Sequence, residues 1–372
     1  MIVLGIESSC DETSAAVVRN GDTLLSVVTS SSMDLHAQYG GVVPEIAARS
    51  HIECINGVIS QSIEESGCTW DDIDAIAVTY GAGLGGSLLI GVMTARTLAI
   101  VHDKPLYAIN HVEGHVYANF ITHTGLHPAL ADYQLPSKQP MFPLLALIVS
   151  GGHSQLVLFQ DHFDYTLLGQ THDDAIGEAF DKVAKMIGLP YPGGPSIAEK
   201  AQSGNVHAFD FPKAKLTHIS PALTALRGSE QGPSYDFSFS GLKTAVLRAA
   251  QASVGADHSF PSRDLPGRLS EPQKADLAAS FQRVAVETVV DKAIAAYEEF
   301  QPTSVVIAGG IAARPELRRQ LAERLPIPIE YADQRLCSDN AAMIATLGCF
   351  HMKYDRPTAD PYSLEIAPNL SM

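Results

Sequence analysis

The sequence predicts an α/β protein made of two domains built on one plan. The apolar run Ile2–Ile6, the small polar turn Glu7–Ser14 and the apolar run Ala15–Val18 indicate a β-hairpin. The same arrangement recurs about 140 residues later, where Leu144–Val149 and Gln155–Phe159 flank a turn that contains two glycines. Elsewhere, strand-like runs alternate with stretches of helical spacing, which is typical of α/β layers.

Three strand-to-helix units and two further helices complete the predicted framework. Apolar runs bounded by turn residues predict the strands, and apolar residues at helical spacing predict the helices. In order, the predictions are a strand at Ile73–Thr79 and a helix at Leu88–Ile100, a strand at Pro105–Ile109 and a helix at His111–Ile121, a helix at Gly177–Ile187 running into a rigid loop at Gly188–Pro195, a strand at Ser304–Ala308 and a helix to about Leu325, and a helix at Asp339–Phe350.

Three polar stretches with Pro and Gly predict surface insertions, to which no chemistry is assigned. They are Thr122–Gln139, Lys213–Pro233 and Val254–Pro266.

The composition excludes several classes of protein. With 372 residues, 46% apolar and 18% charged, the chain can bury a large core, which excludes a disordered or fibrous protein. The formal charge of −16 repels polyanions, so any nucleic-acid contact requires a local basic patch. The five cysteines are widely spaced without a CxxC pair, so neither a disulfide framework nor a thiolate zinc site is indicated.

The chain is expected to be cytoplasmic. Its first residues carry an acidic pair where a signal peptide needs a basic start, so no export is expected. The longest apolar stretches, such as Ser87–Val101, are interrupted by polar residues and fall short of the roughly 20 apolar residues that span a bilayer.

Two histidines four residues apart give the first chemical signal. On a helix, His111 and His115 lie on one face and can share a metal ion. The sequence reads HVEGH rather than HExxH, so Glu113 lies about 200° around the helix from the first histidine, away from such an ion. From the spacing alone, a purely structural pair remains an alternative.

Glycine-rich turns give the second signal. Gly151–Gly152, Gly193–Gly194 and Gly309–Gly310 allow backbone N–H groups to approach phosphate oxygens closely. Two of these turns follow predicted strands, which favours a nucleotide cleft between two α/β domains, although each is also explained as a tight turn. No GxxxxGK[ST] motif is present and no GxGxxG motif opens a helix, which disfavours P-loop and Rossmann sites.

Charged residues in turns and helices give weaker signals. Asp11 and Glu12 in the first hairpin turn could position a substrate or a metal-bound water, and Asp181 and Lys182 are further candidates. For any one of these residues, a solvated surface charge is the more common explanation. Cys10 is flanked by acids and lacks the electropositive setting of a nucleophile. The clustered lysines and arginines do not by themselves indicate RNA binding.

Seven sequence blocks occur in order from residue 5 to about residue 345: GIESSCDETSAAVV, HAQYGGVVPEIAARSHI, NHVEGHVYA, VSGGHSQLV, DDAIGEAFDKVAKMIGLPYPGGP, DFSFSGLKTAV and SDNAAMIA. Together they resemble the TsaD family, the tRNA threonylcarbamoyltransferase subunits formerly called O-sialoglycoprotein endopeptidases. The resemblance implies an actin-like ATPase (ASKHA) fold, with two duplicated α/β domains around a nucleotide cleft. The implied activity transfers a threonylcarbamoyl group from threonylcarbamoyl-AMP to N6 of adenosine 37 in tRNAs that read codons beginning with A.

The resemblance also implies site residues. One divalent metal ion per subunit, iron or zinc, would be held by His111, His115 and Asp339. The adenylate would bind to backbone N–H groups through its phosphate and to a carboxylate through its ribose hydroxyls, with glycines allowing close approach. The implied binding residues are Ile148, Val149, Ser150, Gly151, Gly152, Asp181 and Gly194. The general base is not obvious, and Glu12 and Asp11 are the candidates.

One position departs from the family pattern. The family usually reads GGVxAN after the third strand, with Asn as a nucleotide contact, whereas this chain has Arg314 there. Arg314 either replaces that contact, as a substrate-binding residue, or points elsewhere. A milder departure is Ala82, where the family is expected to have Pro.

The resemblance further implies tRNA and threonylcarbamoyl-AMP as partners, together with two companion bacterial proteins, the inactive paralogue TsaB and the small ATPase TsaE. We expect an N-terminal domain at residues 1–120, completed by a C-terminal helix at about 335–372, and a second domain at 121–334.

Three other functions remain open at this stage. An ATPase or sugar kinase of the same fold would turn over ATP without tRNA. A scaffold subunit would bind nucleotide without catalysis, although an intact His111, His115 and Asp339 set argues against it. A metalloprotease, the family's older label, is disfavoured by the position of Glu113.

Overall fold

The computed structural model describes residues 1–372, which divide into two compact units. The first unit comprises Met1–Met141 and Glu330–Met372, and the second comprises Phe142–Ile329. The sequence predicts domain boundaries after residues 120 and 334, whereas by contact the chain divides after residues 141 and 329.

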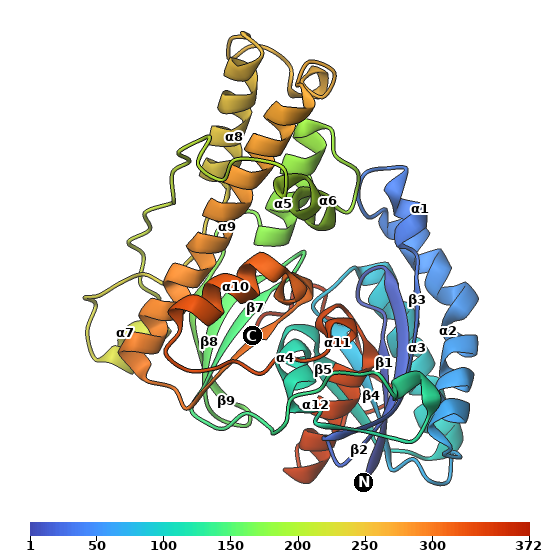
Figure 1. Ribbon diagram of the computed structural model, residues 1–372. Coiled ribbons are helices and arrows are strands. Elements are labelled where there is room, and N and C mark those ends of the chain that lie inside the picture. Colours follow the sequence, from blue (N-terminus) through green and yellow to red (C-terminus); the bar gives the residue numbers. More distant parts are fainter. The chain divides into compact units, whose positions relative to one another are not determined.

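The first unit is built on a six-stranded sheet of order β5-β4-β1-β2-β3-β6 (Figure 1). Strands β1, β2 and β3 pair antiparallel, while β4 pairs parallel with both β1 and β5. The strands are β1 (Ile2–Glu7), β2 (Glu12–Arg19), β3 (Thr23–Ser31), β4 (Ala75–Gly81), β5 (Leu106–Asn110) and β6 (His123–Thr124). The helices are α1 (Met33–Ala37), α2 (Pro44–Ser66), α3 (Gly85–His102), α4 (His111–Tyr117), η1 (Ala118–Phe120), η2 (Pro128–Leu130), α11 (Gln334–Cys337) and α12 (Ala341–Lys353).

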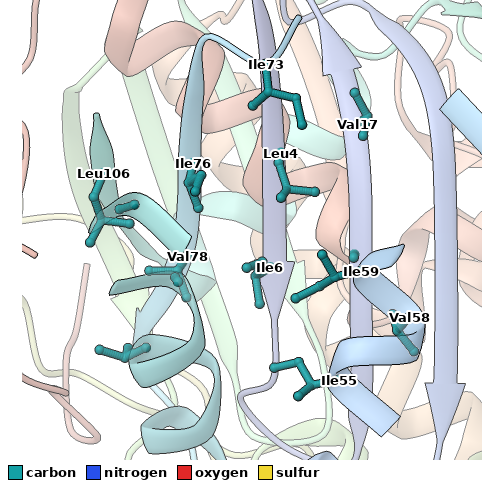
Figure 2. Close-up of a cluster of buried hydrophobic side chains, with 14 of the residues drawn as sticks. Leu4, Ile6, Val17, Ile55, Val58, Ile59, Ile73, Ile76, Val78 and Leu106 are labelled. Atoms are coloured by element: carbon teal, nitrogen blue, oxygen red, sulfur yellow. The ribbon is translucent and has the colours of Figure 1, made fainter. Parts of the chain in front are cut away.

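Helices cover both faces of this sheet. On one face, Leu4 and Ile6 of β1 pack with Ile55 and Ile59 of α2 in one hydrophobic cluster (Figure 2). On the other face lies α12, which is buried from Ala341 to Phe350 and apolar around its circumference, as expected of a core helix. It lies directly on β1, because a Cβ at Gly5 would be only 2.4 Å from the carbonyl oxygen of Ala341.

The second unit is built on a four-stranded sheet of order β10-β7-β8-β9. Its long helix α9 begins with a capping box formed by Ser270 and Gln273 and packs against α5, α6, α8 and α10. The strands are β7 (Leu144–Val149), β8 (Ser154–Asp161), β9 (Asp164–Gln170) and β10 (Ser304–Ala308). The helices are α5 (Ile176–Ile187), α6 (Gly193–Ala201), α7 (Pro221–Arg227), α8 (Ser240–Ser253), η3 (Ser262–Asp264), α9 (Glu271–Phe300), η4 (Gly310–Ala313) and α10 (Pro315–Arg324).

The two sheets repeat one topology. In the first, β4 lies parallel to β1, which continues antiparallel through β2 and β3. In the second, β10 lies parallel to β7, which continues antiparallel through β8 and β9. The duplicated α/β plan predicted from the two hairpins is therefore confirmed. The third antiparallel strand of each unit, β3 or β9, was not predicted.

Two local predictions were wrong. The segment Gly188–Pro195 was predicted to be a rigid loop throughout, but α6 begins at Gly193. Proline is compatible with the first helical turn, where backbone N–H groups have no partner within the helix, so Pro195 does not prevent this start. The helix predicted after Ser304–Ala308 is divided into η4 and α10, with Pro315 in the first turn of α10.

Helix α3 is long and apolar enough to cross a membrane by length and composition, a criterion that core helices of other proteins also meet. In this structure it packs against β4 and α2. Its Arg96 donates hydrogen bonds to the carbonyl oxygens of Pro361, Tyr362 and Leu364. The helix thus fastens the C-terminal segment to the first unit.

Candidate functional site

The three predicted metal ligands meet in the first unit. Nε2 of His111 lies 3.5 Å, and Nε2 of His115 3.3 Å, from the same carboxylate oxygen of Asp339. One possible ligand atom from each residue lies within 4.8 Å of the others. Two imidazoles and one carboxylate form a ligand set suited to zinc or iron, with coordination positions left for an exogenous ligand.

The polar atoms of His115 indicate that a cation fits here. His115 is 1% exposed, and although its Nε2 lies 3.3 Å from Asp339, neither ring nitrogen makes a hydrogen bond. Because a buried polar atom without a partner is costly, such a side chain needs an explanation. A metal ion coordinated by Nε2 supplies one.

A buried carboxylate holds His111 in place. Oε2 of Glu7 lies 3.1 Å from Nδ1 of His111, so that Nε2 faces Asp339. Glu7 is fully buried and accepts further hydrogen bonds from the hydroxyl of Thr79 and the backbone N–H of Ser9, each at 2.5 Å. This is the arrangement in which a carboxylate behind a histidine fixes its tautomer and its orientation toward a metal.

The charges around His111 favour a cation. Burial opposes a charge on this imidazole, but the carboxylates of Asp339 and Glu7 outweigh burial and raise the pKa of His111 to about 9. Burial also favours the neutral form of Glu7, yet His111 holds the pKa of Glu7 below its usual value. The site therefore attracts positive charge, whether it is a proton or a metal ion.

Caps and close packing position these ligands. Asn110, the last residue of β5, accepts hydrogen bonds from the backbone N–H groups of Val112 and Glu113, and so starts α4 at His111. Asn340 caps α12 and also donates to the carbonyl oxygens of Leu336 and Ser338. These bonds fix the short segment that carries Asp339.

The acidic turn of the first hairpin lies near the same ligands. Burial, followed by the carboxylates of Asp339 and Asp11, raises the pKa of Glu12 to about 10. Glu12 therefore holds a proton near neutral pH unless a cation offsets these neighbouring charges. Burial and the neighbouring carboxylates also raise the pKa of the Cys10 thiol, which agrees with the prediction that Cys10 lacks the setting of a nucleophile.

Glu113 stands apart from the three ligands. It is buried, and its Oε1 has no hydrogen-bond partner. Burial raises the pKa of its carboxyl to about 7, although the positive charge of Arg356 acts in the opposite direction. It is not among the residues whose ligand atoms converge. The structure thus brings no HExxH-type glutamate to the group.

In the second unit, the predicted phosphate turn follows β7. The backbone N–H of Ser150 donates to the carbonyl oxygen of His153, and the hydroxyl of Ser150 accepts from the N–H of His153. Gly151 and Gly152 are exposed, with open space where a Cβ would lie. Ile148 and Val149 are fully buried and Ser150 is also buried, so of these predicted contacts only Gly151 and Gly152 face solvent.

The other predicted adenylate residues cluster around Arg314. A carboxylate oxygen of Asp181 accepts a hydrogen bond from the backbone N–H of Gly193 at 2.7 Å. Burial lowers the pKa of Arg314, and the negative charge of Asp181 acts in the opposite direction. A Cβ at Gly194 would lie 2.7 Å from a guanidinium nitrogen of Arg314. Nε of Arg314 is buried without a hydrogen-bond partner. The residue that departs from the family pattern therefore lies beside Asp181 and Gly194.

Two residues of the first unit that support the ligand set are not predicted from the sequence. Glu7 and Asn340 are not among the predicted ligands. Glu7 holds His111, and Asn340 holds the segment that carries Asp339. A signal existed for Asn340, since Asn directly before a helical pattern is a typical cap. No signal in the sequence pairs Glu7 with His111, because Glu7 ends β1 and His111 begins α4, about a hundred residues further along the chain.

The repeated sheet, with its parallel strand and two antiparallel neighbours, is that of the actin-like α/β class. A sequence model of the family described as tRNA N6-adenosine threonylcarbamoyltransferase matches residues 23–346. The chain belongs to this family.

Curated relatives agree over nearly the whole length. The tRNA N6-adenosine threonylcarbamoyltransferase of Thermomicrobium roseum is 49% identical over 352 residues, which cover 93% of this chain and 90% of that protein. The protein of the same name from Clostridium perfringens is 43% identical over 374 residues, covering 100% of this chain and 98% of that protein. That of Dehalococcoides mccartyi is 41% identical over 372 residues, covering 100% and 99%.

Solved structures similar to this chain have low sequence identity to it. Component A of the (R)-2-hydroxyglutaryl-CoA dehydratase of Acidaminococcus fermentans aligns with a TM-score of 0.47 and 14% identity, covering 93% of this chain and 96% of its own. The ROK hexokinase from Thermus thermophilus aligns with a TM-score of 0.42 and 16% identity, covering 95% and 100%.

Proposed function

We propose that this protein transfers the threonylcarbamoyl group from threonylcarbamoyl-AMP to N6 of adenosine 37 in tRNAs that read codons beginning with A. The full-length similarity to proteins named tRNA N6-adenosine threonylcarbamoyltransferase supports the reaction. The observation that carries the proposal is the convergence of His111, His115 and Asp339 on one point, with both ring nitrogens of the buried His115 lacking hydrogen bonds.

These three residues would hold one divalent ion, iron or zinc. When bound, the ion supplies Lewis-acid stabilisation of negative charge on the intermediate's oxygens. Glu7 acts behind it: its hydrogen bond keeps the proton of His111 on Nδ1 and leaves Nε2 available for coordination.

The adenylate would bind along the second unit. Exposed backbone at Gly151 and Gly152 offers N–H groups for phosphate oxygens, and Asp181 offers a carboxylate for ribose hydroxyls. Arg314 lies beside Asp181 and Gly194, which supports a role for it in place of the family's Asn contact at the adenine end.

Attack of an adenine amine on the carbamoyl carbon, with AMP leaving, depends on alignment and charge stabilisation more than on a protein nucleophile. The amine must also lose a proton. Asp11 and Glu12 are the candidates to accept it, since the carboxylate of Asp339 acts electrostatically on Glu12 and Asp11 is its neighbour in the chain. Glu12 becomes competent as a base only when a cation lowers its pKa from about 10.

The proposed setting is the cytoplasm, with tRNA as substrate and two companion proteins, TsaB and TsaE. The absence of a strong basic excess favours a tRNA surface that is shared with partners, because the formal charge of this chain is −16.

Nucleoside analysis of tRNA tests the function. Unmodified tRNA is incubated with this protein, both companion proteins and threonylcarbamoyl-AMP. We expect threonylcarbamoyladenosine with the wild type and with His207→Ala, an exposed histidine outside the site, but not with His115→Ala. In a separate incubation of this protein alone with ATP, conversion of ATP to ADP would instead indicate an ATPase or kinase. Bound adenylate without any product would indicate a scaffold.

A further inference from the structure

A second group of two histidines and one aspartate lies in the second unit. His172 follows β9, His218 lies in the segment before α7, and Asp236 precedes α8. Nε2 of His172 lies 2.7 Å, and Nδ1 of His218 2.6 Å, from the same oxygen, Oδ2 of Asp236. One possible ligand atom from each residue lies within 4.8 Å of the others.

The carboxylate of this group is buried and fixed. The side chain of Asp236 is 5% exposed, and its second oxygen, Oδ1, accepts the backbone N–H of Gln170 at 3.0 Å. The backbone around it is also paired, because the N–H of Phe237 donates to Gln170 and the N–H of His172 donates to Phe237. Asp236 and His172 are therefore held together by main chain as well as by their side chains.

The histidines, by contrast, are accessible. The side chains of His172 and His218 are 46% and 57% exposed, so an ion can reach the group from solvent. His218 belongs to residues 211–220, which form neither helix nor strand. Its contact with Asp236 joins this segment to the end of β9.

We propose that His172, His218 and Asp236 form a zinc site, separate from the first, that fastens residues 211–220 to the end of β9. Two imidazoles and a carboxylate match zinc in ligand type, and a water would complete a tetrahedron. Two ligands at about 2.0–2.2 Å from one tetrahedral ion lie more than about 3 Å apart, so each nitrogen must move slightly away from Oδ2 of Asp236. The exposed His218 can make this adjustment.

Binding at this site requires a change of tautomer in each imidazole. In the metal-free arrangement Nε2 of His172 and Nδ1 of His218 donate to Asp236. On coordination each ring carries its proton on the other nitrogen, which is the accessible tautomer of a neutral histidine.

The surrounding charges set the expected order of affinity. Lys292 of α9 acts on Asp236 electrostatically, while its ammonium group donates to the carbonyl oxygen of Ser234. This positive charge opposes a dication. The group around His111, in contrast, has the additional negative charge of Glu7. Zinc is therefore expected to fill the first group before the second.

Zinc content tests the proposal independently of tRNA modification. The full chain is stripped of metal, titrated with Zn²⁺ alone, desalted and analysed for bound metal. We compare His218→Ala with His207→Ala, both in a His111→Ala/His115→Ala background that removes the first group. The His207→Ala protein should retain one zinc per chain and the His218→Ala protein none. Because both proteins lack the first group, failure of the proposed transferase chemistry does not affect this comparison.

Limited trypsin cleavage after Lys215, an exposed residue of the fastened segment, reports where the ion acts. Added Zn²⁺ should slow this cleavage in the His207→Ala protein and leave it unchanged in the His218→Ala protein. Equal zinc content in the two proteins would overturn the proposal, as would equal slowing of cleavage. In that case the two histidines serve only as hydrogen-bond donors to Asp236.

Discussion

At the scale of single residues, one buried carboxylate decides how His111 is presented. Glu7 accepts three hydrogen bonds, and only the one from His111 reaches the proposed ligand set. Replacing Glu7 with Gln keeps the shape of the side chain but removes the charge that favours a cation. We expect the metal dissociation constant to rise about 10–100-fold, the range seen when such supporting partners are removed.

Metal titration of the stripped protein by calorimetry measures this effect. Glu230→Gln, at an exposed position, is the matched control and should bind like the wild type. An unchanged affinity in Glu7→Gln would show that His111 keeps its orientation without the carboxylate.

Arg314 stands where the family resemblance leads us to expect Asn, and its surroundings predict its role. Nε is buried without a partner, and the guanidinium lies against Gly194 beside Asp181. If it contacts the adenine end, Arg314→Ala should weaken the binding of adenosine and AMP alike. Loss of a charged hydrogen bond corresponds to about 1.5–3 kcal/mol, or roughly 10–100-fold in affinity.

Equilibrium binding of adenosine and of AMP shows whether Arg314 contacts the adenine end, the phosphate or neither. Arg263→Ala, an exposed arginine, provides the control. A loss confined to AMP would assign Arg314 to the phosphate, and no loss for either ligand would mean that it points away from the nucleotide.

At the scale of elements, the predictability of each strand and helix depends on what it buries. The strands β7 and β10 are continuous apolar runs, and their predicted and observed bounds agree. Helix α2 escaped prediction because its buried positions include His51 and Ser62, which interrupt the apolar pattern. These polar groups are satisfied by Thr13 and Ser26 on neighbouring strands, a tertiary arrangement that local periodicity does not encode.

The same distinction applies to the site. The spacing of His111 and His115 suggests a shared metal from local geometry alone. Asp339 is far along the chain, so only the family resemblance joins it to them. Glu7 was missed because its pairing with His111 depends on the register of β1 beside β4 and β5.

The space around two glycines, one at the contact between β1 and α12 and one on the surface of α2, predicts opposite effects on stability when each is replaced with alanine. In Gly5→Ala, the new Cβ would lie 2.4 and 2.6 Å from backbone atoms of α12, so the helix must shift. Overpacking of this kind typically lowers the free energy of unfolding by about 1–3 kcal/mol. Gly57 is exposed within α2 and has nothing within 4 Å of a Cβ, so Gly57→Ala should raise stability by roughly 0.4–1 kcal/mol.

Urea unfolding, followed by circular dichroism, compares the two variants with the wild type. Equal midpoints for Gly5→Ala and the wild type would contradict the close approach of α12 to β1.

At the scale of the whole molecule, charge limits how the chain meets tRNA. The formal charge is −16, and many of the basic side chains are paired with acids. Lys182 contacts Asp174 and Glu178, and Arg319 contacts Glu316 and Glu323. Such paired cations contribute little to a long-range attraction for phosphates.

This distribution predicts how tRNA binding responds to salt. Each neutralised phosphate releases counterions and steepens the fall of affinity with salt, by about 0.7–0.9 in the double-logarithmic slope. If companion proteins supply most of the basic surface, the slope for this chain alone should be shallow and should become steeper when they are added. Fluorescence anisotropy of labelled tRNA between low and physiological salt measures both slopes. A steep slope for the chain alone, unchanged by the companions, would mean that unpaired cations of this chain form the tRNA surface themselves.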